Sequence, residues 1–182
     1  MTILSIANLR LLVDISTHKS DIIVTNSLES VEVNFIKKFY KDSLFIYILN
    51  NLNVSPPSAL VELILGGGTY EDNISPPKSF HLYGLNKAIA LLTYCDLMIK
   101  QTSITRFGAT NKNDQYSTKP NVDDSIIQIN RYRETAIAYL KEIDYMLINC
   151  DETEFSTGDQ AIIEIYREEN NNEVKRLFEA FE

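Results

Sequence analysis

The sequence predicts a mainly α-helical protein: a helical bundle around a buried central helix, with a long projecting loop or β-hairpin and a short mixed C-terminal tail. Two features predict it. Several segments carry an apolar residue at every third or fourth position, which places those side chains on one face of a helix. A further segment, about 82–101, is apolar on nearly every side, and such a helix belongs in the middle of a bundle or an assembly.

Length, composition and charge bound the class of protein. A chain of 182 residues fits one domain and buries roughly 70% of its unfolded surface, so it needs no disulfide or metal to fold. Its 45% hydrophobic and 23% charged residues are ordinary for a soluble globular protein. The net charge of −8 argues against a protein that grips nucleic-acid phosphates, because that requires clustered Lys and Arg. The same charge suits a wall along which DNA slides without sticking.

The N-terminus and the cysteines favour a cytoplasmic protein. Residues 1–16 have no basic lead-in and are interrupted by Arg10 and Asp14, unlike a signal peptide or a membrane span. Cys95 and Cys150 are far apart in sequence, so we expect buried reduced thiols rather than a disulfide framework or a zinc site. The chain is therefore expected to be made and kept in a cytoplasm, or in something assembled there.

Four helices are expected before a run of three glycines. A short amphipathic piece at 5–13 precedes a polar connection and a longer helix at 27–40. Shorter helices follow at 43–52 and 58–65, and Ser55 is expected to cap the last of them. The apolar residues expected to share one face within the first three helices are Ile6, Leu9, Leu12, Val13, Leu28, Val31, Phe35, Phe39, Phe45, Ile48, Leu49 and Leu52.

The glycine run is expected to form a turn. Gly66, Gly67 and Gly68 follow a helix, where a tight turn with positive φ is most easily made by glycine. A phosphate-binding loop would require GxxxxGK[ST], and no Lys-Ser or Lys-Thr pair follows these glycines. The next segment, 69–80, contains two adjacent prolines and should be extended or hairpin-like.

The central helix carries a narrow polar line. Asp96 is its one acid, and two structural partners are open to it. It pairs with Lys100, four residues on, or it reaches across to an arginine of the last long helix. The polar residues of the line are Asn86, Thr93, Asp96 and Lys100.

A long polar segment, 102–122, separates the central helix from the last long one. Loops beyond roughly 12–15 residues are uncommon in compact domains and are usually functional or disordered. We expect this one to project from the bundle and to contact another copy or a partner, with Phe107 as the anchor. The following helix extends from about 124 to 149, with an inner stripe of Ile126, Ile129, Tyr132, Ala136, Leu140, Ile143 and Leu147.

Two domains of unequal size are expected. Residues 1–150 form the helical domain, and residues 151–182 form a C-terminal extension that contacts a neighbouring protein. Within the extension, 161–166 alternates like a strand and 173–181 is expected to be a short helix.

No catalytic, cofactor-binding or metal-binding residue is predicted, and the chain is not expected to be an enzyme or to need a cofactor. His18 and His81 have no partner at metal-ligand spacing. Asp123 and Asp124 begin a helix, where acids stabilise the exposed N–H groups. The ten tyrosines suit either buried interfaces or core packing.

The order of the segments resembles the head–tail connector (adaptor, or head-completion) proteins of tailed bacteriophages, especially those of Bacteroidetes phages, including the crAss-like group. The resemblance covers about residues 3–148 and has four parts. They are SIANLRLLVDIS with ESVEVNFIKKFYKDSLFIYIL, then LILGGGTY with a polar spacer into F-x-x-YGLNKAIALLTYCDLM, then TRFGATNKNDQYS, and last IIQINRYRETAIAYLKEIDYML.

The resemblance implies a ring, usually of twelve copies, below the portal at the capsid vertex. Such a ring extends the DNA channel, lets duplex DNA pass without specific binding, and presents a surface to which the tail docks. It places the protein in the virion at the head–tail interface, and in the host cytoplasm during assembly, with no membrane. The residues expected to contact a neighbouring copy or partner are Thr105, Phe107, Gly108, Tyr116, Arg131 and Arg133.

Two other functions compete with this interpretation. An enzyme is disfavoured because the sequence contains no nucleophile–base or metal constellation. A cytosolic helical adaptor or regulatory protein-binding module stays open, because an all-α bundle with a loop suits many functions.

Overall fold

The computed structural model describes residues 2–15, 19–40, 42–71, 77, 79–105, 108–111, 122–149 and 155, with the backbone alone at 101–105, 108–111, 122–125 and 149. The chain is mainly helical, as predicted. The expectations for His18, Phe107, Tyr116, Cys150, 161–166 and 173–181 lie outside the described residues.

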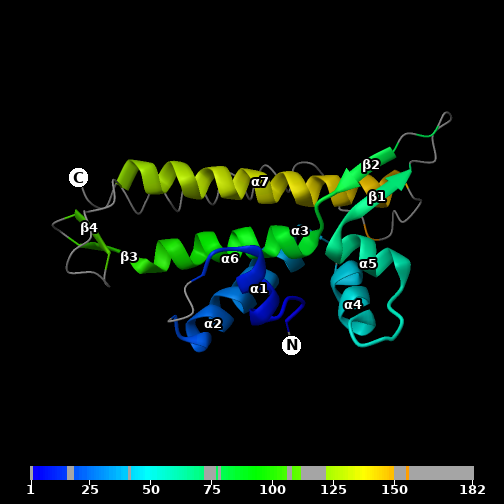
Figure 1. Ribbon diagram of the computed structural model, residues 1–182, viewed down its shortest axis with the longest axis horizontal. Helices are drawn as coiled ribbons and strands as arrows, with labels where there is room; N and C mark the ends of the chain where they lie inside the picture. The colour runs from blue at the N-terminus through cyan, green and yellow to red at the C-terminus, as the bar shows by residue number, and fades with distance from the viewer. Residues whose placement is uncertain are drawn as a thin grey trace.

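The helices form layers around α6 (Leu85–Gln101). Figure 1 shows α7 (Val122–Asn149) lying along one side of α6, with α1 (Ile6–Leu12) and α2 (Asp21–Val31) on the other. The α6 side chains of Leu85, Ala88, Ile89 and Ala90 are fully buried. The prediction of a buried central helix is therefore confirmed.

Helix α6 begins three residues later than the sequence predicted. Leu82 still pairs with Gly68 in a hairpin, and Gly84 has φ +86°, which is not a helical value. Within the helix, Asp96 Oδ2 lies 2.6 Å from Lys100 Nζ, which confirms the first of the two expected partners. Lys100 Nζ also donates to Ser27 Oγ at 3.2 Å, which ties α6 to α2.

The helix predicted at 27–40 starts earlier and changes its winding. It begins at Asp21 because Val24 is fully buried and extends the inner stripe upstream. After Val31 it continues as a π-helical turn, η1 (Glu32–Ile36), and ends in α3 (Lys37–Phe39). A π turn holds more residues than an α turn, so Ile36 is buried in the core beside Phe35, which is partly buried and packs against it.

Two details of the first helices differ from the prediction. In α1, Leu9 is fully buried but Leu12 is 39% exposed, because the short helix turns only a narrow face inward. The cap of α5 (Ala59–Gly66) is Ser58, whose Oγ accepts from Val61 N–H at 3.1 Å, so the cap expected at Ser55 was wrong.

Helix α4 (Asp42–Asn51) agrees with the helix predicted at 43–52 to within one residue at each end. Leu44 and Ile48 are its fully buried side chains. They are four residues apart, so they lie on the same face of the helix.

Two antiparallel hairpins lie at opposite ends of α6 (Figure 1). The first pairs β1 (Gly68–Glu71) with β2 (Ser79–Leu82), which confirms the expected hairpin at 69–80. The second pairs β3 (Thr102–Thr105) with β4 (Gly108–Asn111), so the polar segment after α6 starts as a β-hairpin.

The last long helix has the predicted inner face. Ala136, Leu140, Ile143 and Leu147 are fully buried, and Ile129 is nearly so. Phe155 lies beyond the expected domain boundary at 150, yet it is buried and stacks on Tyr47 with ring centroids 4.9 Å apart. The core therefore includes at least one residue of the expected extension.

The buried acid Glu32 holds the N-terminal segment. Its two carboxylate oxygens accept the backbone N–H groups of Ile3 at 2.8 Å and Leu4 at 3.0 Å. Burial raises the pKa of the Glu32 carboxyl, and the two N–H donors partly oppose that shift.

A pH dependence of stability follows from Glu32. Because its folded-state pKa is raised above 4.5, its contribution to the unfolding free energy is greatest below that pH and is lost as pH rises through the folded pKa. We expect Glu32→Gln to flatten this part of the stability–pH curve measured by urea unfolding. Glu62→Gln, an exposed change on α5, should leave that part of the curve unchanged. If the unfolding free energies of wild type and Glu32→Gln change with pH in parallel, Glu32 is not the source of this pH dependence.

Candidate functional site

Two glycines position the first hairpin against the helices. Gly67 (φ +78°) and Gly84 (φ +86°) lie backbone to backbone. A Cβ at Gly84 would lie 2.6 Å from the nitrogen of Gly67, and a Cβ at Gly67 would lie 2.4 Å from the carbonyl oxygen of Leu82. Gly67 is the C-cap of α5 and has the expected positive φ, whereas Gly66 is the last residue of α5 and Gly68 is the first of β1. The joint therefore fixes where the hairpin leaves the bundle.

The hairpin packs its aromatic face on the C-terminal half of α7. Tyr70 of β1 stacks on Phe80 of β2 with centroids 5.4 Å apart. Phe80 meets the ring of Tyr145 edge-on at 5.7 Å. Offset and edge-to-face pairs of this kind add about 0.5–1.5 kcal/mol each beyond the area they bury. The hairpin is thereby held on α7 by rings contributed from three elements.

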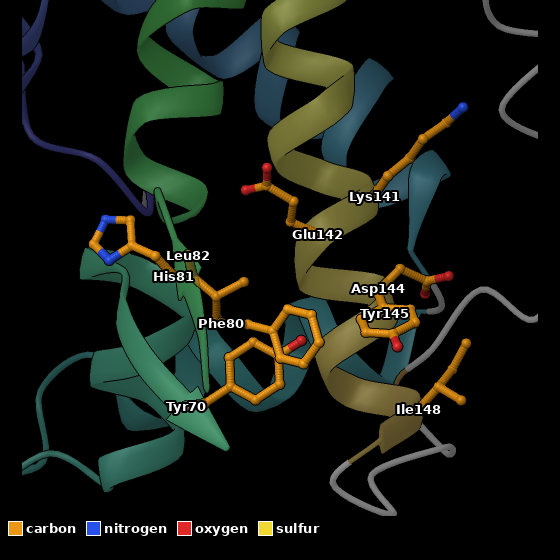
Figure 2. A pocket seen from close by; sticks show the side chains of 9 residues that line it. All are labelled: Tyr70, Phe80, His81, Leu82, Lys141, Glu142, Asp144, Tyr145 and Ile148. Atoms are coloured by element: carbon orange, nitrogen blue, oxygen red, sulfur yellow. The ribbon is translucent and has the colours of Figure 1, made fainter. Parts of the chain in front are cut away.

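A pocket of about 420 Å³ opens between this hairpin and α7. Figure 2 shows the rings of Tyr70, Phe80 and Tyr145 gathered side by side in it, with Lys141 pointing outward. The lining residues are Tyr70, Phe80, His81, Leu82, Lys141, Glu142, Asp144, Tyr145 and Ile148. The pocket thus combines an apolar, aromatic part with a charged rim, a composition common in ligand-binding clefts.

Glu142 lines this pocket, and burial there changes the pKa of its carboxyl. Burial raises the pKa of its carboxyl, while the charge of His81 and the backbone N–H of Tyr83 act in the opposite direction. Its Oε2 is buried and has no hydrogen-bond partner among the described residues. A cationic side chain entering the pocket would supply the missing donor.

Several tyrosines from different parts of the chain pack on α7. Tyr83 stacks on Tyr139 at 4.5 Å, and Lys87 Nζ lies 5.2 Å from the ring centroid of Tyr83. Tyr94 and Tyr132 meet edge-on at 5.6 Å. Tyr40 is buried and donates its hydroxyl to the carbonyl oxygen of Leu140 at 2.7 Å. These contacts account for much of the tyrosine content through packing, the second of the two alternatives that the sequence left open.

The outer face of α7 is exposed along the length of the helix. Its exposed residues recur at spacings of three and four, so they form one stripe. The stripe has apolar side chains at both ends and charged side chains between them, and the residue at its middle has a small side chain. Its members are Ile127, Arg131, Glu134, Ala138, Lys141, Tyr145 and Ile148.

The structure separates the six residues expected to contact a partner. Thr105 ends β3 and pairs with Gly108 at the start of β4, so these two lie at the closed end of the second hairpin. Arg131 is exposed on the α7 stripe, but Arg133 is half-buried, and its charge acts on the thiol of Cys95. Phe107 and Tyr116 are the two outside the described residues, so the contact role of all six stays a prediction.

Sequence reasoning missed the pocket. Tyr70, Phe80 and Tyr145 come from segments far apart in sequence, and no local spacing links them. The one available signal was alternation: Phe80 and Leu82 lie on one face of a strand and Tyr70 sits opposite Phe80 in the register.

Cys95 is unsuited to nucleophilic chemistry. It is buried and free, and its thiol lies 3.6 Å from the carbonyl oxygen of Ile129. Burial raises the pKa of this thiol to about 12, although the charge of Arg133 opposes the shift. The expectation of a buried reduced thiol is confirmed at this position.

Slow labelling of Cys95 is therefore expected. In a Cys150→Ser chain, a thiol reagent at pH 8 should leave Cys95 unmodified in native conditions and modify it fully in urea, because the thiolate is the reactive form. Fast stoichiometric labelling of the native chain would contradict the buried position.

Among the described residues we find neither a metal-ligand cluster nor a membrane-spanning helix. No three or more His, Cys, Asp or Glu side chains in it are grouped to hold a metal ion. Nor does any helix there combine the length and the apolar character needed to cross a bilayer.

The fold and the pocket define a class: a mainly helical protein with an aromatic pocket and an exposed helical stripe. Residues 36–162 match the family described as "Family of unknown function (DUF6712)", and the chain belongs to that family. The match extends past the domain boundary expected at 150, in agreement with the buried Phe155. Searches of curated proteins and of solved structures found no match.

Proposed function

We propose that the protein is a structural component of a tailed-phage virion that forms an oligomeric ring below the portal. In this role it joins the capsid to the tail and extends the DNA channel. Twelve copies, the portal and further tail or ring proteins are its proposed partners, and residues 151–182 add a contact to a neighbouring protein. The proposal rests on the resemblance of the chain and on surfaces suited to repeated contact.

The observation that carries the proposal is the exposed stripe of α7. A ring needs a head-to-tail contact made from two different surfaces of each copy. The stripe offers one such surface, with Arg131 and Glu134 placed for charge pairs and the small Ala138, one turn after Glu134, for close approach. The β3–β4 hairpin, which extends beyond the end of α6 in Figure 1, offers a second.

A substitution on the stripe tests the ring. We would measure particle mass by light scattering for the chain alone, and by negative-stain microscopy after co-expression with the portal protein of its genome. Ala138→Arg should abolish ring formation, because it places a long charged side chain at the centre of the contact. Ala7→Arg, an equally exposed change on α1, should not. A chain that forms no ring in either setting would rule out the proposal.

The passive channel predicts a negative result with DNA. At a net charge of −8, the isolated chain should show no measurable affinity for duplex DNA at physiological salt in a fluorescence anisotropy titration. Salt-dependent binding with a micromolar Kd would indicate a positive surface that grips phosphates. The protein would then be a gate that holds DNA instead of a passive wall.

A second candidate function is a helical protein-binding module in a cytoplasm. The aromatic pocket between the β1–β2 hairpin and α7 favours it, because rings with a charged rim suit a short peptide partner. The two functions differ in solution: the module stays monomeric at all concentrations and with the portal present.

A further inference from the structure

The pocket lies beside the point where the C-terminal segment leaves the helical domain. Ile148 lines the pocket, and α7 ends at the next residue, Asn149. Phe155 then anchors the chain on Tyr47. Residues 156–182, which are 27 residues, follow this anchor. The chain therefore leaves α7 beside the pocket and is next held on α4, at Phe155, before residues 156–182 begin.

The end of that segment has the sequence of a groove-binding helix. Its apolar residues stand at relative positions i, i+3, i+4 and i+7, the spacing by which amphipathic helices anchor in hydrophobic grooves. The four anchors are Val174, Leu177, Phe178 and Phe181. Glu173 and Lys175 flank this apolar face, one on each side.

We propose that residues 173–181 bind, as a short amphipathic helix, in the pocket between the β1–β2 hairpin and α7 of the same chain. Phe178 and Phe181 pack against the rings of the pocket. Lys175 reaches the buried Oε2 of Glu142, which lacks a donor among the described residues, and Glu173 faces Lys141. The charges of helix and rim are thus opposite in both pairs.

The connection favours the chain's own segment over that of a second copy. Residues 156–172 connect Phe155 to this segment through 17 residues, which span at most about 60 Å when fully extended. Because the segment is tethered within this reach, its effective concentration at the pocket is on the order of 1 mM, far above the concentration of a second copy in dilute solution. This docking is a property of the single chain, so it stands whether or not the chain forms rings.

A peptide competition tests the proposal on the full-length chain. The probe is a fluorescent peptide of residues 170–182, titrated by anisotropy against wild type and against Leu177→Ser/Phe178→Ser/Phe181→Ser, whose own segment is released. The triple variant should bind the peptide. If its Kd is about 100 μM, wild type should bind about 10-fold more weakly, because the linked segment competes at about 1 mM.

Matched variants locate the site. In the triple-variant background, Tyr145→Ala and Ile148→Ser should each weaken peptide binding at least 10-fold, while the exposed, distant change Leu11→Ala should leave it unchanged. Thermal melting identifies any pocket variant that fails to fold, and Ile148→Ser is the milder of the two because the residue is 45% exposed. A triple variant that does not bind the peptide would overturn the proposal. Equal binding by wild type and triple variant would also overturn it, because the pocket of wild type would then be open.

Discussion

Gly84→Ala is expected to destabilise the protein by at least about 2 kcal/mol, the sum of backbone strain and overpacking. Gly84 has φ +86°, a conformation that side chains with a Cβ rarely adopt. The added Cβ would also lie 2.7 Å from the carbonyl oxygen of Leu65 and 2.6 Å from the nitrogen of Gly67. Both neighbours are backbone atoms, so no side chain can move aside, and either the hairpin or α6 has to shift.

Gly66→Ala is the matched control for this change. Gly66 is the last residue of α5, and nothing lies within 4 Å of the position its Cβ would take. Alanine there should be neutral or stabilising by about 0.4–1 kcal/mol, because it restricts the unfolded chain. Urea unfolding followed by circular dichroism compares the two variants. Equal midpoints for Gly84→Ala and Gly66→Ala would show that the glycine joint does not constrain the fold.

Leu92→Ala in the middle of α6 is expected to cost about 2–5 kcal/mol of unfolding free energy. Leu92 is 5% exposed, in the helix that lies between α7 and the α1–α2 side of the molecule. The loss combines the transfer free energy of the deleted groups with the cavity left among neighbours that relax only in part.

The same substitution at an exposed site calibrates this result. Leu11 is 84% exposed on α1, so Leu11→Ala should change the unfolding free energy by less than about 0.5 kcal/mol. Denaturant titrations of both variants give the difference directly. A Leu92→Ala cost as small as that of Leu11→Ala would place α6 on a surface, and the bundle described above would be wrong.

If the C-terminal segment docks in the pocket, assembly and docking are connected. The pocket includes Lys141, Tyr145 and Ile148, which also belong to the exposed stripe of α7. A helix bound there would cover one end of the stripe. Under both proposals, release of residues 173–181 would free that end for a neighbouring copy, so the triple tail variant should assemble at lower concentration than wild type.

Local sequence was sufficient for the elements whose spacing is regular. The inner face of α7 at Ala136, Leu140 and Ile143 could be predicted because helical periodicity alone selects which side chains share a face. The turn at Gly67 could be predicted because glycine adopts positive φ without a Cβ penalty. Both properties depend only on the residue and its near neighbours in sequence, so they can be predicted without knowing how the rest of the chain folds.

The tertiary structure decided what depends on distant partners. Gly84 is needed because the backbone of Gly67 packs on it, and Glu32 is buried because the N–H groups of Ile3 and Leu4 need an acceptor. The pocket exists because residues of β1, β2 and α7 converge, and no spacing within one element encodes that meeting. By itself, then, the sequence determined a helical bundle with a central helix. Packing between segments far apart in the chain decided the positions of the Gly67–Gly84 contact, the buried Glu32 and the pocket.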